Sequence, residues 1–352
     1  MAEQKTLPTS ASVDAHVKRA ACIAWVIVGA AIAIAPRSAA AQRVGAESPC
    51  DERIAPITSG FGADGPYAMD QATVPNPTLP RQSVTVFLPR GAGGKRPVVF
   101  FAHGFGPGVW EAYADLIRHA VSRGYAVVYS TYPMFGATLD VRYDDLWAGF
   151  AAAVGRYGDR LDLTRVAFVG HSFGGGATPA MTYRGVVQHG WGSSGALAFE
   201  LAPWYALEIT DAQLKEIPPR VVQAVEVYDR DDTNDPRMAI DLYEHSAAKD
   251  RFFFRVQSAA VSGCAVTADH STPGRNPSLR QKQYGVFRPF DALMDFAFGN
   301  AAARDSLAAM GGVSSSGGYA PLRLELRPVP ADSGRSYNYP WDSPQNPQRD
   351  RR

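Results

Sequence analysis

Short apolar runs alternate with amphipathic segments between residues 83 and 310. Residues 83–89 (SVTVFLP) alternate apolar and polar side chains, which is typical of an edge or half-buried strand. Further runs are mostly continuous in apolar residues, as expected of strands covered on both faces. They occupy residues 98–102, 125–130, 165–169, 196–201, 221–228 and 252–257. The pattern therefore predicts a sheet whose inner strands are buried.

The segments between these runs carry helical periodicity. Residues 109–122 place Trp110, Tyr113, Leu116, Ile117, Ala120 and Val121 on one stripe. Comparable patterns cover 141–156, 174–184 and 287–309. Repeated strand–helix–strand units predict an α/β fold, with a mainly parallel central sheet of about eight strands and helices on both faces. In such sheets the functional site lies at the carboxyl ends of the strands.

The N-terminal 41 residues have the order of a secretory signal. Basic residues precede an apolar run at 20–35, and Ala39–Ala41 follow as a cleavage site. An uncleaved membrane anchor is the alternative, but the run is shorter than the roughly 20 residues that a membrane span needs. We therefore expect a signal peptide at 1–41, an N-terminal arm at 42–80, one main domain at 81–310 and a flexible C-terminal tail at 311–352.

Composition and charge narrow the classes of partner. The chain has 352 residues, of which 46% are hydrophobic and 20% charged, as in an ordinary globular protein. Removal of 1–41 changes the formal net charge from +1 to −1. This near-neutral balance gives no electrostatic reason to expect a nucleic acid or an anionic membrane as partner, and we expect no stable membrane insertion after signal removal. We expect the protein to be secreted or periplasmic.

Cysteine usage agrees with an oxidising compartment. Cys22 leaves with the signal, and Cys50 and Cys264 remain as an even pair. A disulfide between them is the favoured reading, and one buried thiol with a second in a mobile arm is the alternative. The chain contains no Cys-x-x-Cys, His-Glu-x-x-His or P-loop pattern, so we expect neither a metal nor another cofactor.

The stretch VAFVGHSFGGGA, residues 166–177, holds the strongest candidate for chemistry. Its G-x-S-x-G pattern follows a predicted strand and precedes a predicted helix, the context in which a sharp turn exposes the oxygen of Ser172 as a nucleophile. A serine needs a neighbouring base. Of the histidines, His270 in TADHSTPG falls in a loop just beyond the last strand, whereas the ring of His171 is expected to point elsewhere.

The base needs an acid that orients it. The strand at 221–228 ends in YDRDDTNDP, from which Asp232 is favoured because it lies before Thr233, a few residues past the strand. Asp231 and Asp235 remain alternatives. The Gly-rich turn FAHGFGPG at 101–108 follows another strand, so the backbone amides of Phe105 and Phe173 are candidates for an oxyanion hole.

These motifs resemble the α/β-hydrolase superfamily across roughly 80–310. HGFG, SRGYAVV, TRVAFVGHSFGGG, the Asp-rich turn and DHSTP are similar to the branch of dienelactone hydrolases, chlorophyllases, platelet-activating-factor acetylhydrolases and bacterial cutinase-like polyester hydrolases. GPYAM at 65–69 resembles secreted cutinase-like enzymes. Aromatic residues at the positions of Phe105 and Phe173 match that branch, whereas His171 stands where its members often carry tryptophan. The resemblance implies an α/β-hydrolase catalytic domain at 81–310.

We therefore expect a serine hydrolase that cleaves small or lipid-like carboxylic esters through an acyl-enzyme, with Ser172, His270 and Asp232 as its triad. Phe105, Trp204 and Tyr205 are candidates for an apolar substrate pocket, and core packing is the alternative for these aromatics. Residues 203–219 form either a small lid or a connecting helix. The alternatives in function are a thioesterase, lactonase or dienelactone-type hydrolase with the same triad, and a non-catalytic ligand-binding protein of the same fold.

Overall fold

The computed structural model of the chain describes residues 48–310, 318–329, 337, 341–344 and 346–348. The predicted signal peptide at 1–41 lies outside these residues. Within them, no helix has both the length and the apolar character that crossing a bilayer requires.

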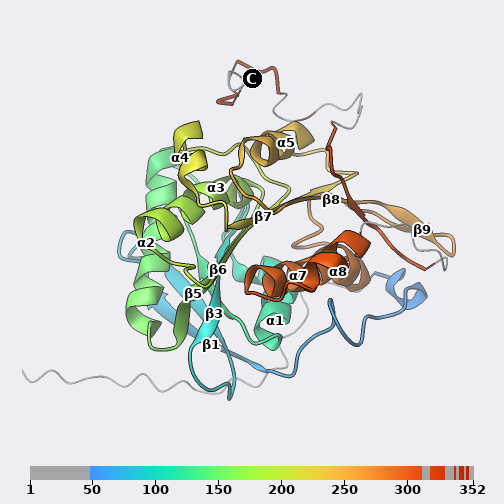
Figure 1. The fold of residues 1–352 in the computed structure, drawn as a ribbon, viewed down its shortest axis with the longest axis horizontal. Coiled ribbons are helices and arrows are strands. Elements are labelled where there is room, and N and C mark those ends of the chain that lie inside the picture. Colours follow the sequence, from blue (N-terminus) through green and yellow to red (C-terminus); the bar gives the residue numbers. More distant parts are fainter. Residues whose placement is uncertain (1–47, 311–317, 330–336, 338–340, 345, 349–352) are drawn as a thin grey trace, which may run out of the picture. The chain divides into compact units, whose positions relative to one another are not determined.

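A nine-stranded, mostly parallel sheet forms the centre of the fold (Figure 1). Its strands lie in the order β1-β2-β4-β3-β5-β6-β7-β8-β11. The strands are β1 (Met69–Pro75), β2 (Ser83–Pro89), β3 (Arg96–Ala102), β4 (Ala126–Ser130), β5 (Leu161–His171), β6 (Gly195–Leu201), β7 (Val222–Tyr228), β8 (Arg251–Val256) and β11 (Leu322–Leu324). Strands β3 to β8 run parallel, and the pairs β1–β2, β2–β4 and β8–β11 are antiparallel. The predicted α/β class is confirmed.

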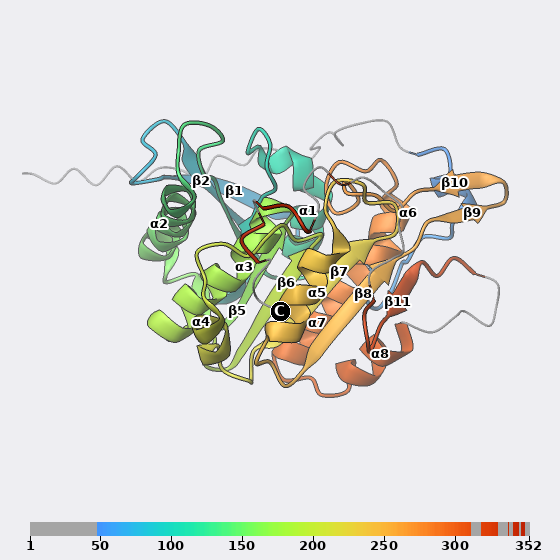
Figure 2. The same cartoon turned by 90° about the horizontal axis from the view of Figure 1, so that it is seen from above.

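Helices cover both faces of this sheet (Figures 1 and 2). One core packs α1 (Ala114–Ser122), α7 (Arg288–Ala297) and α8 (Ala303–Met310) against one face. A second core packs α2 (Leu139–Tyr157), α3 (Phe173–Thr182) and α4 (Asp211–Glu216) against the other. The remaining short elements are η1 (Asp51–Arg53), η2 (Trp110–Tyr113), η3 (Tyr183–Gln188), α5 (Pro236–His245), β9 (Ala259–Val261), β10 (Cys264–Val266), α6 (Leu279–Lys282) and η4 (Gln283–Phe287).

Alternation along the strands explains why their apolar runs are continuous. In β3, Val99 and Phe101 belong to the core under α1 and α7, whereas Val98 and Phe100 belong to the core under α2 and α3. Because successive side chains point to opposite faces, a strand covered on both sides needs apolar residues at every position. This requirement made the inner strands readable from the sequence.

The direction of the chain reverses between β3 and β5. From β3 the chain crosses through α1 to β4 on one side, whereas from β5 it crosses through α3 to β6 on the other side. The loops after β3 and β5 therefore diverge and leave a crevice at the carboxyl ends of the strands, which is where open α/β sheets bind ligands. The loop that begins at His103 and the turn at Ser172 border this crevice.

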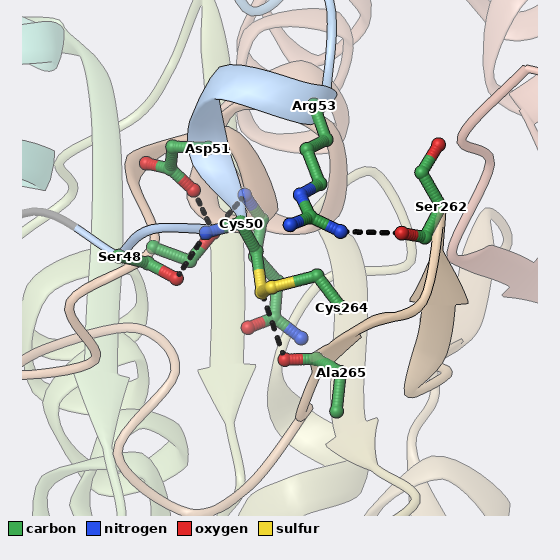
Figure 3. Close-up of a disulfide and its surroundings, with 9 residues drawn as sticks. Ser48, Cys50, Asp51, Arg53, Ser262, Cys264 and Ala265 are labelled. Atoms are coloured by element: carbon green, nitrogen blue, oxygen red, sulfur yellow. Dashed lines mark hydrogen bonds between the residues drawn. A yellow bond between two sulfur atoms is a disulfide. The ribbon is translucent and has the colours of Figure 1, made fainter.

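The N-terminal arm at 42–80 contributes more than an irregular segment. Residues 69–75 form strand β1, which pairs along its full length with β2. Cys50 forms the predicted disulfide with Cys264, with the two Cα atoms 5.5 Å apart, and thereby joins the arm to the hairpin β9–β10 (Figure 3). Arg53 adds a hydrogen bond to the carbonyl of Ser262 in the same hairpin. The start of the folded domain therefore lies well before residue 81.

The expectation of a flexible tail at 311–352 is corrected for the described residues of that segment. Strand β11 extends the sheet beside β8. Trp341 is buried against Tyr205 and Met238, and the side-chain amide of Gln348 donates to the carbonyl of Ala206 at 3.1 Å. This part of the tail packs on the domain because Trp341 contacts apolar side chains of α5 and of the segment that follows β6.

The single helix expected at 287–309 is two helices, α7 and α8. Gly299 lies between them at φ 107°, a conformation that a side chain disfavours and that ends α7. The segment 203–219 contains the short helix α4, which begins with a capping box formed by Thr210 and Gln213. Its Leu214 is buried in the core, so this segment is a connecting helix and not a lid.

A buried carboxyl on β7 makes the stability of the fold depend on pH. Burial raises the pKa of Glu226 to about 8, although the hydroxyl of Tyr228 donates to its Oε1 at 2.7 Å and partly offsets this rise. The folded protein therefore keeps a proton that the unfolded chain loses above its ordinary pKa near 4.5. Because the folded state binds this proton more tightly than the unfolded chain does, the free energy of unfolding falls as the pH rises from about 4.5 to about 8.

Glu226→Gln should remove this loss of stability. We subtract the free energy of unfolding of the wild type from that of the variant. This difference should increase by about 4 kcal/mol between pH 4.5 and 8 and stay constant above pH 8. Urea unfolding at a series of pH values measures it. The same change at the exposed Glu244 is the control, and its difference should be flat. A flat difference for Glu226→Gln would contradict the prediction.

Candidate functional site

Ser172 lies on a sharp turn between β5 and α3. Its backbone has φ 56° and ψ −120°, which is a strained conformation for a residue with a side chain. Two main-chain hydrogen bonds hold the turn to the end of β6 and the residues that follow it. The amide of Ser172 donates to the carbonyl of Leu201 at 2.9 Å, and its carbonyl accepts from the amide of Trp204 at 2.8 Å. The strand–turn–helix context that the sequence predicted for Ser172 is present.

Two glycines allow this turn to exist. A Cβ atom on Gly170 would lie 2.1 Å from the carbonyl oxygen of Gly174. One on Gly174 would lie 2.1 Å from the carbonyl oxygen of Ala102, at the end of β3. Both distances are far inside van der Waals contact with main-chain atoms that cannot rotate away. The two glycines of the motif are therefore required by the close approach of three backbone segments.

Ser172 and His270 are brought together as predicted. His270 Nε2 lies 3.0 Å from Ser172 Oγ, and His270 Nδ1 lies 2.8 Å from Asp231 Oδ2. Because a carboxylate only accepts, the proton of the neutral imidazole is on Nδ1, and Nε2 is left to accept from the serine hydroxyl. A serine, a histidine and a carboxylate thus form one hydrogen-bonded line at the carboxyl edge of the sheet.

The carboxylate in this line is Asp231, so the prediction of Asp232 was wrong. Oδ1 of Asp231 accepts from the amides of Thr233 and Asn234 at 2.9 and 3.0 Å, which aims its other oxygen at His270. Asp232 is exposed on the outside of the same turn. The third alternative, Asp235, caps helix α5 and pairs with Arg237. The sequence Asp-x-Thr-Asn is typical of a turn in which the side chain of the first aspartate accepts from the amides two and three residues later. This pattern could have identified Asp231 from the sequence.

The two candidate oxyanion donors come from the loops on either side of the crevice. Phe173 is the first residue of α3, where helix amides have no acceptor within the helix. Phe105 follows Gly104 in the loop after β3, and this loop lies directly against Ser172, since a Cβ on Gly104 would be 3.1 Å from Cβ of Ser172. The predicted placement of both loops beside Ser172 therefore agrees with the structure.

A cavity of about 340 Å³ opens beside the serine and is bordered by Phe105, Val109, Ala112, Tyr113, His171, His270 and Arg275. Its outer rim is apolar and open, because the side chain of Phe105 is 56% exposed and that of Phe135 is 83% exposed, with ring centroids 6.1 Å apart. The guanidinium of Arg142 lies 5.7 Å from the ring of Phe105 and donates to the carbonyls of Pro133 and Met134, which holds the rim loops together.

Of the three aromatics predicted to line a substrate pocket, Phe105 lies at the cavity and the other two do not. Tyr205 is buried against Met238 and Trp341. Trp204 packs in the same cluster and against the core around α3 and α4. The prediction for Trp204 and Tyr205 is corrected: both turn toward α5 and the tail, because residues 203–205 cross over the glycines that begin α3 and lead away from the cavity.

His171 is the neighbour whose part the sequence did not reveal. Its ring does not point away from the site but lies 4.7 Å, centroid to centroid, from that of His270. Its Nε2 is 2.9 Å from the carbonyl oxygen of His270, and its Nδ1 is 2.9 Å from the hydroxyl of Tyr113. Burial lowers the pKa of His171 well below its ordinary value, and the nearby His270 lowers it further.

Comparison with known proteins adds no relative, since no protein-family model and no curated protein matches this chain. Among the residues that the structure places, no cluster of three or more His, Cys, Asp or Glu side chains could hold a metal ion. The geometry around Ser172 is therefore the basis on which a function is assigned.

Gly174→Ala should destabilise the domain strongly. The added methyl group would overlap the carbonyl of Ala102, and relieving the overlap requires β3 and α3 to separate, which we expect to cost at least about 3 kcal/mol. Gly155→Ala is the matched control, because this helical position in α2 has open space around it and should gain about 0.5–1 kcal/mol. Thermal unfolding measures both. Equal melting temperatures for the two variants would refute the packing argument.

Proposed function

We propose that this protein is an exported serine hydrolase that cleaves carboxylic esters through an acyl-enzyme intermediate. The observation that carries the proposal is the line from Ser172 Oγ through His270 to Asp231, with distances of 3.0 and 2.8 Å, at a strained turn beside a cavity. A serine at its free pKa is a weak nucleophile, and a base within hydrogen-bond reach that is itself oriented by a carboxylate is the arrangement that activates it.

In the first half of the reaction, Ser172 Oγ attacks the ester carbonyl carbon while its proton passes to His270 Nε2. Asp231 stabilises the imidazolium that forms and remains a carboxylate throughout. The carbonyl oxygen becomes an oxyanion, which in this scheme accepts hydrogen bonds from the amides of Phe105 and Phe173. The C–O bond to the leaving group then breaks, and His270 returns the proton to the departing alcohol.

In the second half, the same groups act on water. His270 Nε2 accepts a proton from a water molecule as the water oxygen attacks the acyl carbon. Collapse of the second tetrahedral intermediate breaks the bond to Ser172 Oγ, which recovers its proton from the imidazolium, and the carboxylic acid leaves. The free enzyme is restored without any cofactor in this scheme.

The topology also supports an α/β-hydrolase. The nucleophile follows β5, the acid follows β7 and the base lies beyond β8, which is the chain order of that superfamily with the motifs noted in the sequence. The sharp positive φ of Ser172 fits the turn that superfamily uses to expose its serine. The antiparallel strand β2 next to a parallel block is compatible with the same assignment.

The surroundings of the serine favour an apolar ester, either small or lipid-like. Phe105, Val109 and Ala112 border the cavity, and the exposed ring of Phe135 extends the apolar surface at its rim. An acyl chain laid on this surface would bury apolar area with a favourable free energy of about 25 cal/mol per Å². Export is supported by the signal-like pattern of 1–41 and by the Cys50–Cys264 disulfide, since such bridges persist in oxidising compartments.

Replacement of the nucleophile tests the proposal. Ser172→Ala should lower the turnover of p-nitrophenyl butyrate by at least 1,000-fold, because it removes the hydroxyl that hydrogen-bonds His270 Nε2. The circular dichroism spectrum and melting temperature should stay close to those of the wild type. Ser194→Ala, at an exposed serine before β6, should leave turnover unchanged. Hydrolysis retained in the Ser172→Ala variant would eliminate the mechanism.

A fluorophosphonate probe separates an enzyme from a non-catalytic binding protein of the same fold. The wild type should be labelled at Ser172, and the Ser172→Ala variant should not. Folded protein that resists the probe and hydrolyses no ester would make the binding protein the better assignment. If the wild type is labelled, its kcat/KM values on matched oxygen esters, thioesters and lactones then distinguish the alternative hydrolases.

The two neighbouring aspartates give a second test. Asp231→Asn should lower kcat by at least 100-fold, because an amide that donates to His270 would hold the wrong tautomer and could not stabilise the imidazolium. Asp232→Asn changes the same charge one residue away on the exposed side of the turn and should leave kcat within about twofold. Steady-state kinetics on p-nitrophenyl butyrate compares them. A larger loss for Asp232→Asn would reverse the assignment of the acid.

A further inference from the structure

A line of hydrogen bonds that does not include Ser172 connects the loops on the two sides of the nucleophile. The amide of Gly104 lies 2.9 Å from the hydroxyl oxygen of Tyr113. That oxygen lies 2.9 Å from Nδ1 of His171, whose Nε2 lies 2.9 Å from the carbonyl oxygen of His270. The line therefore runs from the loop after β3, through η2 and the end of β5, to the loop of the base.

The direction of every bond in this line is determined by its two ends. A backbone carbonyl can only accept, so Nε2 of His171 must carry the proton and donate to His270. Nδ1 of the neutral ring then accepts from the hydroxyl of Tyr113. The amide of Gly104 can only donate, and the hydroxyl oxygen of Tyr113 receives it. All donors and acceptors in the line are satisfied in this single arrangement.

The arrangement requires a neutral His171. A proton on Nδ1 would turn this atom from acceptor to donor and leave the buried hydroxyl hydrogen of Tyr113 without a partner, which is costly inside a protein. Burial of His171, together with the nearby His270, lowers its pKa, and burial raises the pKa of Tyr113 to about 12, so both groups stay in the required state. Both rings are buried, at 6% and 7% exposure.

We propose that Tyr113 and His171 form a positioning unit that sets the spacing between the base loop at His270 and the oxyanion loop at Gly104–Phe105. This inference rests on the proposed esterase function for its kinetic consequence, although the unit itself is a feature of the fold. His171 hydrogen-bonds the main-chain carbonyl of His270, whereas the reacting Nε2 of His270 hydrogen-bonds Ser172. Tyr113 accepts from the amide of Gly104, next to that of Phe105. Both residues thus act through catalytic groups and are positioning residues.

The spacing matters because a catalytic group displaced by about 1 Å loses much of its effect. His270 is held by Asp231 at one ring nitrogen, and the hydrogen bond from His171 holds its backbone. Gly104 is held by Tyr113 on the other side of Ser172. Loss of either member should therefore disturb the base and the oxyanion donor together and should lower kcat more than it changes KM.

A double-mutant cycle with Tyr113→Phe and His171→Phe tests the proposal. Both substitutions keep a ring and remove the hydrogen bonds. Rates on p-nitrophenyl butyrate are divided by the amount of Ser172 that a fluorophosphonate labels at completion, which corrects for unfolded protein. We expect each single variant to lower kcat about 10-fold with KM within threefold, and the double variant to lose about as much as one single variant, because the two residues act as a unit.

Tyr125→Phe is the matched control, since Tyr125 lies before β4 at the end of that strand remote from Ser172 and its replacement should leave kcat and KM unchanged. A double variant whose kcat falls about 100-fold, the product of the two single effects, would overturn the proposal. Single variants whose kcat falls less than twofold would overturn it as well. A uniform fall in melting temperature without a change in kcat per labelled serine would show a merely structural role and would also overturn it.

A readout that needs no ester separates this proposal from the proposed function. Hydrogen exchange of peptides that cover 103–109 and 269–276 should be faster in both single variants than in the wild type, with no change in peptides of β6 and β7, and Tyr125→Phe should match the wild type. Unchanged exchange in either loop overturns the positioning unit even if the protein hydrolyses esters. Faster exchange in a protein that hydrolyses no ester would support the unit and reject the esterase.

Discussion

The close packing of three backbone segments at the end of β3 is the constraint on which the site depends. Gly170, Gly174 and the carbonyl of Ala102 approach so closely that no side chain fits between them. At this packed turn Ser172 has a φ of 56°, and its Oγ lies 3.0 Å from His270 Nε2. The packing also brings the loop after β3 against the start of α3, so Ser172 and both candidate oxyanion amides share one close backbone contact. The strain at Ser172 persists because the surrounding sheet determines the turn from both sides.

His270 must reach this turn from the loop beyond β8, a strand that is separated from β5 by two strands. The intervening loops brace one another so that it can. The hydroxyl of Ser258 donates to Asp229 and accepts from the amide of Ala268, and the carbonyl of Ala268 accepts from the amide of Arg230. The loop of His270 is thus hydrogen-bonded to the turn that carries Asp231, and the disulfide at Cys264 ties the preceding hairpin to the N-terminal arm. Asp231 and His270 are therefore placed as one assembly and not on two independent loops.

Much of this could be predicted from the sequence because its signals were local. Continuous apolar runs gave the inner strands, and G-x-S-x-G between a strand and a helix gave Ser172. The pairing of Cys50 with Cys264 followed because they are the two cysteines left after signal removal.

The choice of Asp231 over Asp232 depended on which side chain accepts from the amides of its own turn, and the four neighbouring aspartates hid that difference. Trp204 and Tyr205 turned away from the cavity because the tail supplies Trp341 as a partner, a contact across more than 130 residues that no local pattern encodes. The strands β1 and β11 were missed for a related reason, since edge strands take their definition from the neighbour with which they pair.

The ring of His171 was expected to point elsewhere, and its contacts explain how two histidines can lie side by side without interfering. A charge on His171 would oppose the imidazolium that the proposed reaction forms on His270, whose ring centroid is 4.7 Å away. Burial prevents that charge, and so do the fixed directions of the hydrogen bonds to Tyr113 and to the carbonyl of His270.

His103, which precedes Gly104, is also kept neutral, because burial lowers its pKa to about 4. In the proposed reaction, the positive charge that arises on His270 therefore meets the carboxylate of Asp231 and no competing imidazolium. An aromatic side chain at position 171 would be neutral as well, but it could not accept from Tyr113 and donate to His270 at once. Histidine combines the neutrality that the proposed base requires with the two opposed hydrogen bonds that connect the loop of His270 to the loop at Gly104.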